Sequence, residues 1–335
     1  MSETVVVESG CGCNVDSDSI INGESKVDHS PRVLSIQSHV VSGYVGNKCA
    51  VFPLQALGFE VDFINSVQFS NHTGYGKWKG QVLMDTDLDD LYQGLVDNEL
   101  VNYSHLLTGY VGTVSFLQKI QSVVASIKKK LPNCVYLCDP VLGDNGHFYV
   151  PEALIPVYTR DVLPLADITT PNTFELELFS GMKIVTETDA LLAMDKIHDL
   201  GVKIVVLSSL DSAGADLDTY ASVRSESGTR RVWKTTSPRL DDIFTGTGDL
   251  FAALFLGWYH KLGAENIPEV LRTTLATMQV VLRRTKEYAE AHPKVTTNPT
   301  GRPIPKELRL VQSLDVILNP PLDDHVVTEI PIKLA

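Results

Sequence analysis

The feature that most constrains the fold is a repeated alternation of short apolar runs with longer amphipathic ones. Runs of strand length occur at 32–37, 59–65, 105–108, 135–138, 167–169 and 204–207. Helical patterns fall between them. The first follows the loop 38–47 and ends at 57, and the others lie at 86–97, 113–130, 150–157, 172–180 and 188–200. Continuously apolar strands that alternate with helices form a largely parallel sheet covered on both faces. The sequence therefore predicts an α/β fold.

Polar residues gather where these strands end, which is where parallel sheets bind ligands. The clusters are Ser38 and His39, then 139–144, then 169–172 with Glu175, and finally Ser208 and Ser209. Asp139, Asp144 and Glu175 would bring three carboxylates to one edge of the sheet, and such oxygen ligands suit magnesium. Local alternatives remain open: a helix cap at Asn172 with Glu175 in a capping box, and a turn at Asp139.

A glycine-rich motif, Gly246-Thr247-Gly248-Asp249, runs directly into the apolar segment 250–258. Glycine allows backbone N–H groups to approach a ligand closely, and the first N–H groups of a helix are unpaired at its positive end. The motif therefore predicts an anion hole, with Asp249 inside it. The alternative is a turn in which Asp249 only caps the helix. A helix this apolar is expected to be buried, so its start should point into the protein.

Two other nucleotide-binding motifs are excluded. A dinucleotide fingerprint would need a third glycine where Phe251 stands, and a Walker A loop would need Ser or Thr where Trp78 follows Lys77. The polar and aromatic stretch 70–75 suggests a ligand surface or lid, with a plain surface loop as the alternative.

Charge and composition narrow the possible partners. The 335 residues carry a formal net charge of -13, which argues against nucleic acid. No apolar run approaches the about 18 to 20 residues of a membrane span, so we expect a soluble protein with no membrane partner. The five cysteines indicate reduced thiols in the cytoplasm, and Cys11 and Cys13 lack companions for a metal site. We expect 1–31 to be a disordered acidic tail and 32–335 to be a single domain.

Seven segments carry a resemblance to a known family. They are 32–47, 52–58, 65–75, 107–110, 139–144, 170–175 and 246–251, and the similarity runs from about Arg32 to Ser313. Together they resemble the ribokinase-like superfamily of small-molecule kinases, and within it the pyridoxal kinases. The resemblance implies a ribokinase-like fold, with a mostly parallel central sheet, helices on both faces and a small lid.

The resemblance also implies the reaction and its cofactors. The reaction is ATP-dependent phosphorylation of the 5′-hydroxymethyl group of pyridoxal, pyridoxine or pyridoxamine, as in vitamin B6 salvage. ATP would be the phosphoryl donor, assisted by a divalent cation (magnesium or zinc) and a monovalent one (potassium or sodium). A cytoplasmic homodimer acting on small molecules is implied as well.

Roles follow for the matching positions. Asp249 resembles the catalytic base, and Gly246, Thr247 and Gly248 resemble the anion hole. The vitamer-binding positions are Ser38, His72, Thr73, Tyr110 and Asp249; the ATP-binding ones are Asp139, Asn172, Ser208 and Thr247; the metal positions are Asp144, Thr170 and Glu175. Ser208 departs from the threonine that many relatives carry.

The chemistry of Asp249 can be anticipated. An aspartate has an ordinary pKa of about 3.9, and a helix N-terminus would lower it. We therefore expect Asp249 to be a weak base that orients the hydroxyl and accepts its proton late. The heavier electrostatic stabilisation would come from the amides of 246–248 and from magnesium.

Two alternatives to this function remain open. A hydroxymethylpyrimidine kinase of the same fold would share the anion hole but not the patterns at 38–47 and 71–75. A non-catalytic vitamer-binding protein would use the same scaffold, although the intact Asp249 and its glycines argue against it.

Overall fold

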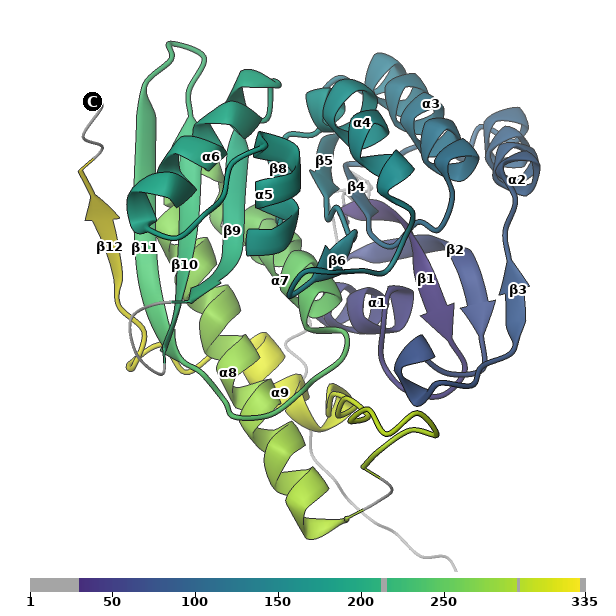
Figure 1. Ribbon diagram of the computed structural model, residues 1–335. Helices are drawn as coiled ribbons and strands as arrows, with labels where there is room; N and C mark the ends of the chain where they lie inside the picture. The colour runs from purple at the N-terminus through teal and green to yellow at the C-terminus, as the bar shows by residue number, and fades with distance from the viewer. Residues whose placement is uncertain (1–29, 212–215, 294–295, 332–335) are drawn as a thin grey trace, which may run out of the picture.

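The computed structural model describes residues 30–211, 216–293 and 296–331. Cys11, Cys13 and nearly all of the expected tail lie outside these ranges. The described residues form a sheet of ten strands in the order β12-β11-β10-β9-β8-β5-β4-β1-β2-β3 (Figure 1). Its strands are β1 Arg32–Val40, β2 Glu60–Phe69, β3 Gly80–Val82, β4 His105–Thr108, β5 Val135–Cys138, β8 Ile168–Thr169, β9 Ile204–Asp211, β10 Asp216–Arg224, β11 Arg230–Pro238 and β12 Val327–Ile330.

The middle of the sheet is parallel, and its two sides are antiparallel. Strands β9, β8, β5, β4, β1 and β2 run in one direction, whereas β3 on one side and β10 to β12 on the other pair antiparallel with their neighbours. A separate short hairpin is formed by β6 Gly143–Asp144 and β7 His147–Phe148. The α/β fold with a mostly parallel sheet is thus confirmed.

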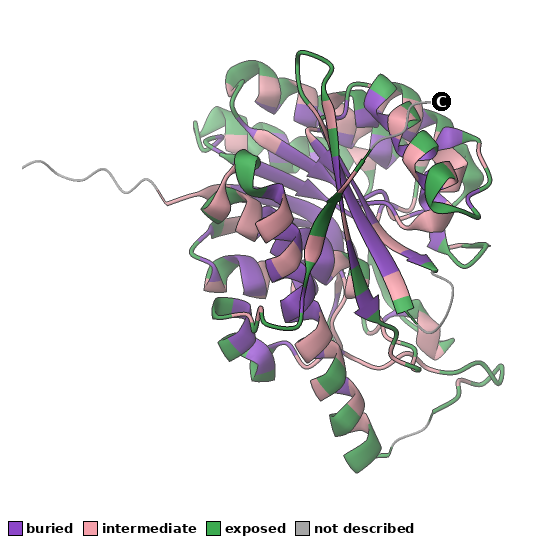
Figure 2. Cartoon of the chain, turned by 90° about the vertical axis from the view of Figure 1, so that its left-hand side faces the viewer, coloured by how far each residue is buried: buried purple, intermediate pink, exposed green. Residues whose placement is uncertain are grey.

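Helices cover both faces of the sheet, and Figure 2 shows the buried strands between them. One layer holds α2 Asp85–Asp97, α3 Val114–Lys130, α4 Ile155–Val157, α5 Thr173–Ser180 and α6 Glu187–Asp199; the other holds α1 Asn47–Ala56, α7 Thr247–Leu262, α8 Ile267–Ala291 and α9 Leu314–Leu318. On β1, Val33 packs into the second layer and its neighbour Leu34 into the first. This alternation explains why the central strands read as continuously apolar.

Helix α7 is the most deeply buried helix bearing a predicted site residue. Every residue from Leu250 to Gly257 is buried, between α1 and α8. Burying each large apolar side chain contributes about 1.5 to 3 kcal/mol relative to exposure, so this helix is held firmly in place. The absence of a side chain at Gly257 allows close approach, since a Cβ there would lie 2.5 Å from Leu57 Cδ1. The expectation of a buried helix is confirmed, and its start is fixed by the core.

Some boundaries differ from expectation. Strand β1 continues to Val40, so Ser38 and His39 lie in its last part, next to a register shift between Gln37 and His39. Strand β2 continues to Phe69, so the loop that carries the stretch 70–75 begins directly after it. That loop also contains a 3-10 turn, η1 Thr73–Tyr75. In the part of the chain that the structure describes, no helix has the length and apolar character needed to cross a bilayer.

Candidate functional site

The start of α7 requires glycine at position 246. Gly246 has φ 74° and is the N-terminal cap of the helix. A Cβ at this position would lie 2.3 Å from the Tyr44 carbonyl oxygen and 2.7 Å from Cys49 Sγ. Side chains other than glycine rarely adopt a positive φ, and none would fit this gap. The helix therefore begins pressed against the loop before α1, with its first N–H groups unpaired within the helix.

Asp249 lies in the first turn of α7 and is held by a backbone amide. The Gly46 N–H donates a hydrogen bond of 2.7 Å to Asp249 Oδ2. Burial raises the pKa of this carboxyl above its ordinary value, and the Gly46 hydrogen bond offsets only part of that rise. The expectation of a lowered pKa is therefore wrong, because loss of solvent disfavours the carboxylate more than nearby dipoles favour it. Asp249 is consequently a stronger base than a free aspartate.

Gly46 also brings a predicted substrate residue next to Asp249. Gly46 has φ 54°, and a Cβ on it would lie 2.0 Å from the Ser38 carbonyl oxygen and 2.4 Å from Ser38 Oγ. Ser38 at the end of β1, Gly46 before α1 and Asp249 on α7 therefore form one contact group. We did not predict a role for Gly46 from sequence. The available signal was a pair of glycines, Gly43 and Gly46, directly after the first strand.

Asp139 follows β5 and carries an unpaired buried oxygen. The side chain is 4% exposed, and Thr170 Oγ1 donates a hydrogen bond of 3.0 Å to its Oδ1. Asp139 Oδ2 is buried, has no hydrogen-bond partner among the residues that the structure describes, and lies 3.8 Å from the position of a Cβ on Gly248. Burial, and then the charges of Glu175 and Asp249, raise the pKa of Asp139 well above its ordinary value. Asp139 Oδ2 is thus a buried acceptor that faces the start of α7. Such an oxygen fits a site that binds a cation or accepts a proton from a ligand.

Asn172 and Glu175 form the capping box that the sequence left open as an alternative. Asn172 Oδ1 accepts the Glu175 N–H at 3.0 Å, and Glu175 Oε2 accepts the Asn172 N–H at 3.0 Å. Glu175 Oε1 also accepts the Leu142 N–H at 2.9 Å, and Asn172 Nδ2 donates to the Gly143 carbonyl at 2.8 Å. Burial raises the pKa of Glu175 to about 7. These two side chains thus hold the loop that follows β5 against the start of α5.

The expected three-carboxylate metal cluster is not present as a ready-made site. Asp144 lies exposed on the β6–β7 hairpin, where Asn145 Nδ2 donates to its Oδ2 at 3.0 Å. The charge of Asp144 raises the pKa of Glu175, and the charge of Glu175 raises the pKa of Asp139, so both aspartates lie near Glu175. Among the residues described, however, no three His, Cys, Asp or Glu side chains are arranged to hold a metal ion.

The remaining predicted residues lie around this centre. His72 is buried and caps η1, with its Nδ1 accepting the Gly74 N–H at 3.1 Å, whereas Thr73 is exposed. Tyr110 follows β4 and packs against the core on the side of α2 and α3. Ser208 lies within β9, which continues past the expected end at 207, and its hydroxyl donates to the Pro171 carbonyl in the loop after β8 at 3.4 Å.

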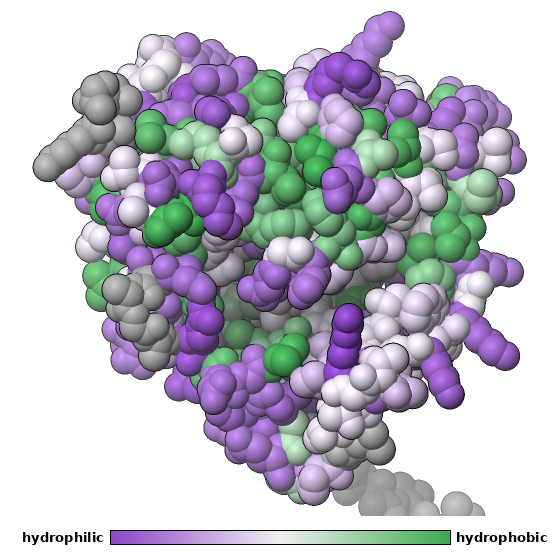
Figure 3. All heavy atoms as spheres, in the orientation of Figure 1, coloured by the Kyte–Doolittle hydropathy of each residue, from purple (hydrophilic) through white to green (hydrophobic). Residues whose placement is uncertain are grey.

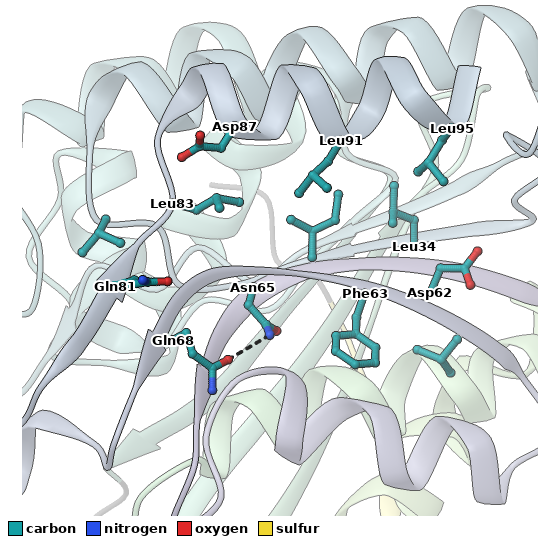
Figure 4. Close-up of a pocket in the computed structure, with 13 residues that line it drawn as sticks. Leu34, Asp62, Phe63, Asn65, Gln68, Gln81, Leu83, Asp87, Leu91 and Leu95 are labelled. Atoms are coloured by element: carbon teal, nitrogen blue, oxygen red, sulfur yellow. Dashed lines mark hydrogen bonds between the residues drawn. The ribbon is translucent and has the colours of Figure 1, made fainter. Parts of the chain in front are cut away.

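Two hollows in the surface bear on the location of the site. Figure 3 shows a hollow near the middle of the face that carries β6 and α7 in Figure 1. A second cavity, of about 700 Å³, lies between α2 and strands β2 and β3. Figure 4 shows residues that line it, such as Phe63 and Leu91. There the Asn65 Nδ2 donates to Gln68 Oε1 at 3.2 Å. This second cavity shares none of the predicted site residues, so we place the chemistry at the start of α7.

Comparison with known proteins gives consistent matches. A family model described as phosphomethylpyrimidine kinase matches residues 104–265. Pyridoxal kinase from Homo sapiens is 47% identical over 302 residues, covering 86% of this chain and 96% of that protein. A putative pyridoxal kinase from Caenorhabditis elegans is 47% identical over 327 residues, covering 93% and 98%. The structure of pyridoxal kinase from Leishmania donovani in complex with ADP and pyridoxine has a TM-score of 0.80 at 32% identity, covering 90% and 99%.

Proposed function

The chain belongs to the pyridoxal kinase family, and from that premise we propose how its own residues act. It is an ATP-dependent kinase that phosphorylates the 5′-hydroxymethyl group of pyridoxal, pyridoxine and pyridoxamine, on a ribokinase-like fold. The observation that carries the site assignment is the group at the start of α7. There Gly46 holds Asp249 through a 2.7 Å hydrogen bond, beside Ser38 and the glycine cap Gly246.

Asp249 receives the proton of the vitamer hydroxyl. The hydroxymethyl oxygen forms a new bond to the γ-phosphorus of ATP while the bond from that phosphorus to the β–γ bridging oxygen breaks. ADP leaves with the bonding electrons, and the hydroxyl proton moves to the Asp249 carboxylate. Transfer is largely dissociative, so the proton moves late. The raised pKa of Asp249 makes this final transfer more favourable than it would be for a solvated aspartate.

The first amides of α7 stabilise the transferred group. Thr247 and Gly248 lie in the first turn after the cap, where helix N–H groups are unpaired and the helix dipole favours negative charge. Because Gly246 is locked against Tyr44, these donors are positioned before the reaction and need no reorganisation during it. Ser38, His72, Thr73 and Tyr110 are the proposed vitamer contacts.

The ATP side is proposed to lie along the strand ends beyond Asp139. Asp139 Oδ2 is buried and lacks a partner among the described residues, so it fits a cation there. Thr170 lies beside it and donates a hydrogen bond to Asp139 Oδ1. Asp144 is exposed on the neighbouring hairpin. A bound divalent cation, magnesium or zinc, would neutralise charge on the ATP phosphates. Glu175 contributes by holding the 139–144 loop, since its oxygens already accept backbone N–H groups. Asn172 and Ser208 would contact the nucleotide, and a monovalent cation, potassium or sodium, would lie near Thr170.

Replacing Asp249 tests the assignment. We expect Asp249→Asn to lower turnover by about two to four orders of magnitude, because the amide cannot accept the proton. ATP binding should persist, since the nucleotide side is untouched. Asp241→Asn, an exposed residue just upstream, is the matched control and should keep full turnover. Near-normal turnover of Asp249→Asn would contradict the proposed role.

A second substrate is favoured by one observation. The family model that matches 104–265 is described as phosphomethylpyrimidine kinase. A coupled ADP-release assay across pyridoxal, pyridoxine, pyridoxamine and hydroxymethylpyrimidine separates the two specificities. Preference for hydroxymethylpyrimidine would support the alternative enzyme, whereas no ADP release with any acceptor would support a non-catalytic vitamer-binding protein.

Assembly and location are also proposals. The family resemblance supports a homodimer, which light scattering of the purified protein would test by its mass. A cytoplasmic location is supported by the free and buried thiols of Cys49, Cys134 and Cys138. Fluorescence of the tagged full chain in cells would check it.

A further inference from the structure

A carboxylate from the C-terminal part of the chain contacts both loops on the proposed vitamer side. Glu307 Oε2 accepts the Tyr44 N–H at 2.8 Å, and Glu307 Oε1 accepts the Tyr75 hydroxyl at 3.4 Å. His72 Nε2 lies 3.2 Å from the same Oε1, near enough for an ion pair but not aligned as a hydrogen bond. The carboxylate also packs against Gly43, where a Cβ would lie 2.3 Å from Oε1.

The backbone that carries Glu307 is fixed to the segment leading into the anion hole. The Lys306 N–H donates to the Ile243 carbonyl at 2.7 Å, and the Thr245 N–H donates to the Lys306 carbonyl at 3.1 Å. The Lys306 ammonium also pairs with Asp242. The position of the Glu307 side chain is therefore set relative to Gly246, which follows Thr245 directly.

We propose that Glu307 is a positioning residue of this kinase, which ties the loop ending at Gly46 and the turn His72–Tyr75 to the anion hole. The inference rests on the proposed function. Tyr44 stands two residues before Gly46, whose N–H donates to Asp249. Loss of the contact between Glu307 and Tyr44 should therefore shift Gly46 and lower turnover. His72 and Tyr75 flank Thr73, so their contacts bear on binding of the vitamer.

The charge of Glu307 strengthens these contacts. Hydrogen bonds to a carboxylate are roughly twice as strong as those between neutral groups. Glutamine at 307 would retain an oxygen for the Tyr44 N–H and an amide that can donate to the Tyr75 oxygen. Alanine would leave both loops without this anchor. The two variants therefore separate loss of charge from loss of the contact itself.

Steady-state kinetics with pyridoxal and ATP provide the first test. We expect Glu307→Ala to lower kcat/KM for pyridoxal by about 10- to 100-fold, with kcat lower and the pyridoxal KM higher. The KM for ATP should stay unchanged, and Glu307→Gln should restore most of the activity. Glu329→Ala, which removes a carboxylate paired with Arg231 at the β12 edge, is the matched control and should behave as wild type. Unchanged pyridoxal kinetics, or a KM for ATP that rises as much as the KM for pyridoxal, would overturn the proposal.

Hydrogen exchange of the protein without substrate tests the positioning role of Glu307 independently of the proposed kinase activity. In Glu307→Ala, amides in 41–49 and 72–76 should exchange faster, while those of α8 stay protected. Unchanged exchange in both loops would overturn the positioning role whatever the substrate. If Glu307→Ala does not fold, Tyr75→Phe removes one of the contacts and should raise only the pyridoxal KM; a KM equal to that of wild type would count against the proposal. A wild-type protein that leaves pyridoxal unphosphorylated would instead refute the proposed function.

Discussion

Replacing Gly46 with alanine should lower turnover as well as stability. The new Cβ would lie 2.0 Å from the Ser38 carbonyl oxygen, so the loop must move. Movement breaks the 2.7 Å hydrogen bond from the Gly46 N–H to Asp249 Oδ2. A hydrogen bond to a charged group contributes about 1.5 to 3 kcal/mol. At about 1.4 kcal/mol for each factor of ten in rate, kcat should fall by about 10- to 150-fold.

Gly58→Ala is the matched control. Gly58 has φ 95°, and apart from its two chain neighbours no heavy atom of the described residues lies within 4 Å of where its Cβ would be. Both substitutions carry the cost of a positive φ, about 1 to 2 kcal/mol, but only Gly46→Ala meets a neighbour and disturbs Asp249. We expect a lower thermal midpoint for Gly46→Ala than for Gly58→Ala, because only its Cβ meets the Ser38 backbone, and a loss of kcat, at saturating pyridoxal and ATP, in Gly46→Ala alone. Equal kcat values would refute the reasoning that Gly46 positions Asp249.

Two predictions concern buried carboxyl groups whose raised pKa makes the folded protein less stable as pH rises. Asp139 holds a proton more tightly in the folded protein than in the unfolded chain. The free energy of unfolding therefore falls as the pH rises from the unfolded pKa of Asp139 to its folded pKa. Asp139→Asn should therefore raise the urea midpoint at about pH 8 while lowering kcat, and a lower midpoint would contradict this. For Glu175, wild-type stability should decline as pH rises from 4.5 to about 7. Glu175→Gln should flatten that decline in urea melts, and an unchanged slope would show that Glu175 does not titrate there.

The sequence was sufficient where structure depends on local pattern. Strands β4 and β5 match their expected limits because both are short runs with a clear end, β4 before Gly109 and β5 before Asp139. Helix α5 begins after Asn172 because the capping box is a local signal. The start of α7 was also recognisable, since Gly246 and the apolar run after it are adjacent in the chain.

The sequence was insufficient where structure depends on distant contacts. Strands β10 and β11 are not continuously apolar and gain their pairing from neighbours in the sheet, so no strands were expected there. The pKa of Asp249 was misjudged because burial is a property of the folded core. Glu307 was missed because its partner Tyr44 lies 263 positions away. Such a contact leaves no periodicity or spacing in the chain.

Identification of the phosphorylated product tests the central claim most directly. Purified protein is mixed with ATP, magnesium and pyridoxal, and ADP and the vitamer product are quantified by mass spectrometry for wild type and for Asp249→Asn. The account predicts equal amounts of ADP and pyridoxal 5′-phosphate from wild type and a trace of either from the variant. ADP formed without pyridoxal 5′-phosphate, or equal product from both proteins, would contradict it.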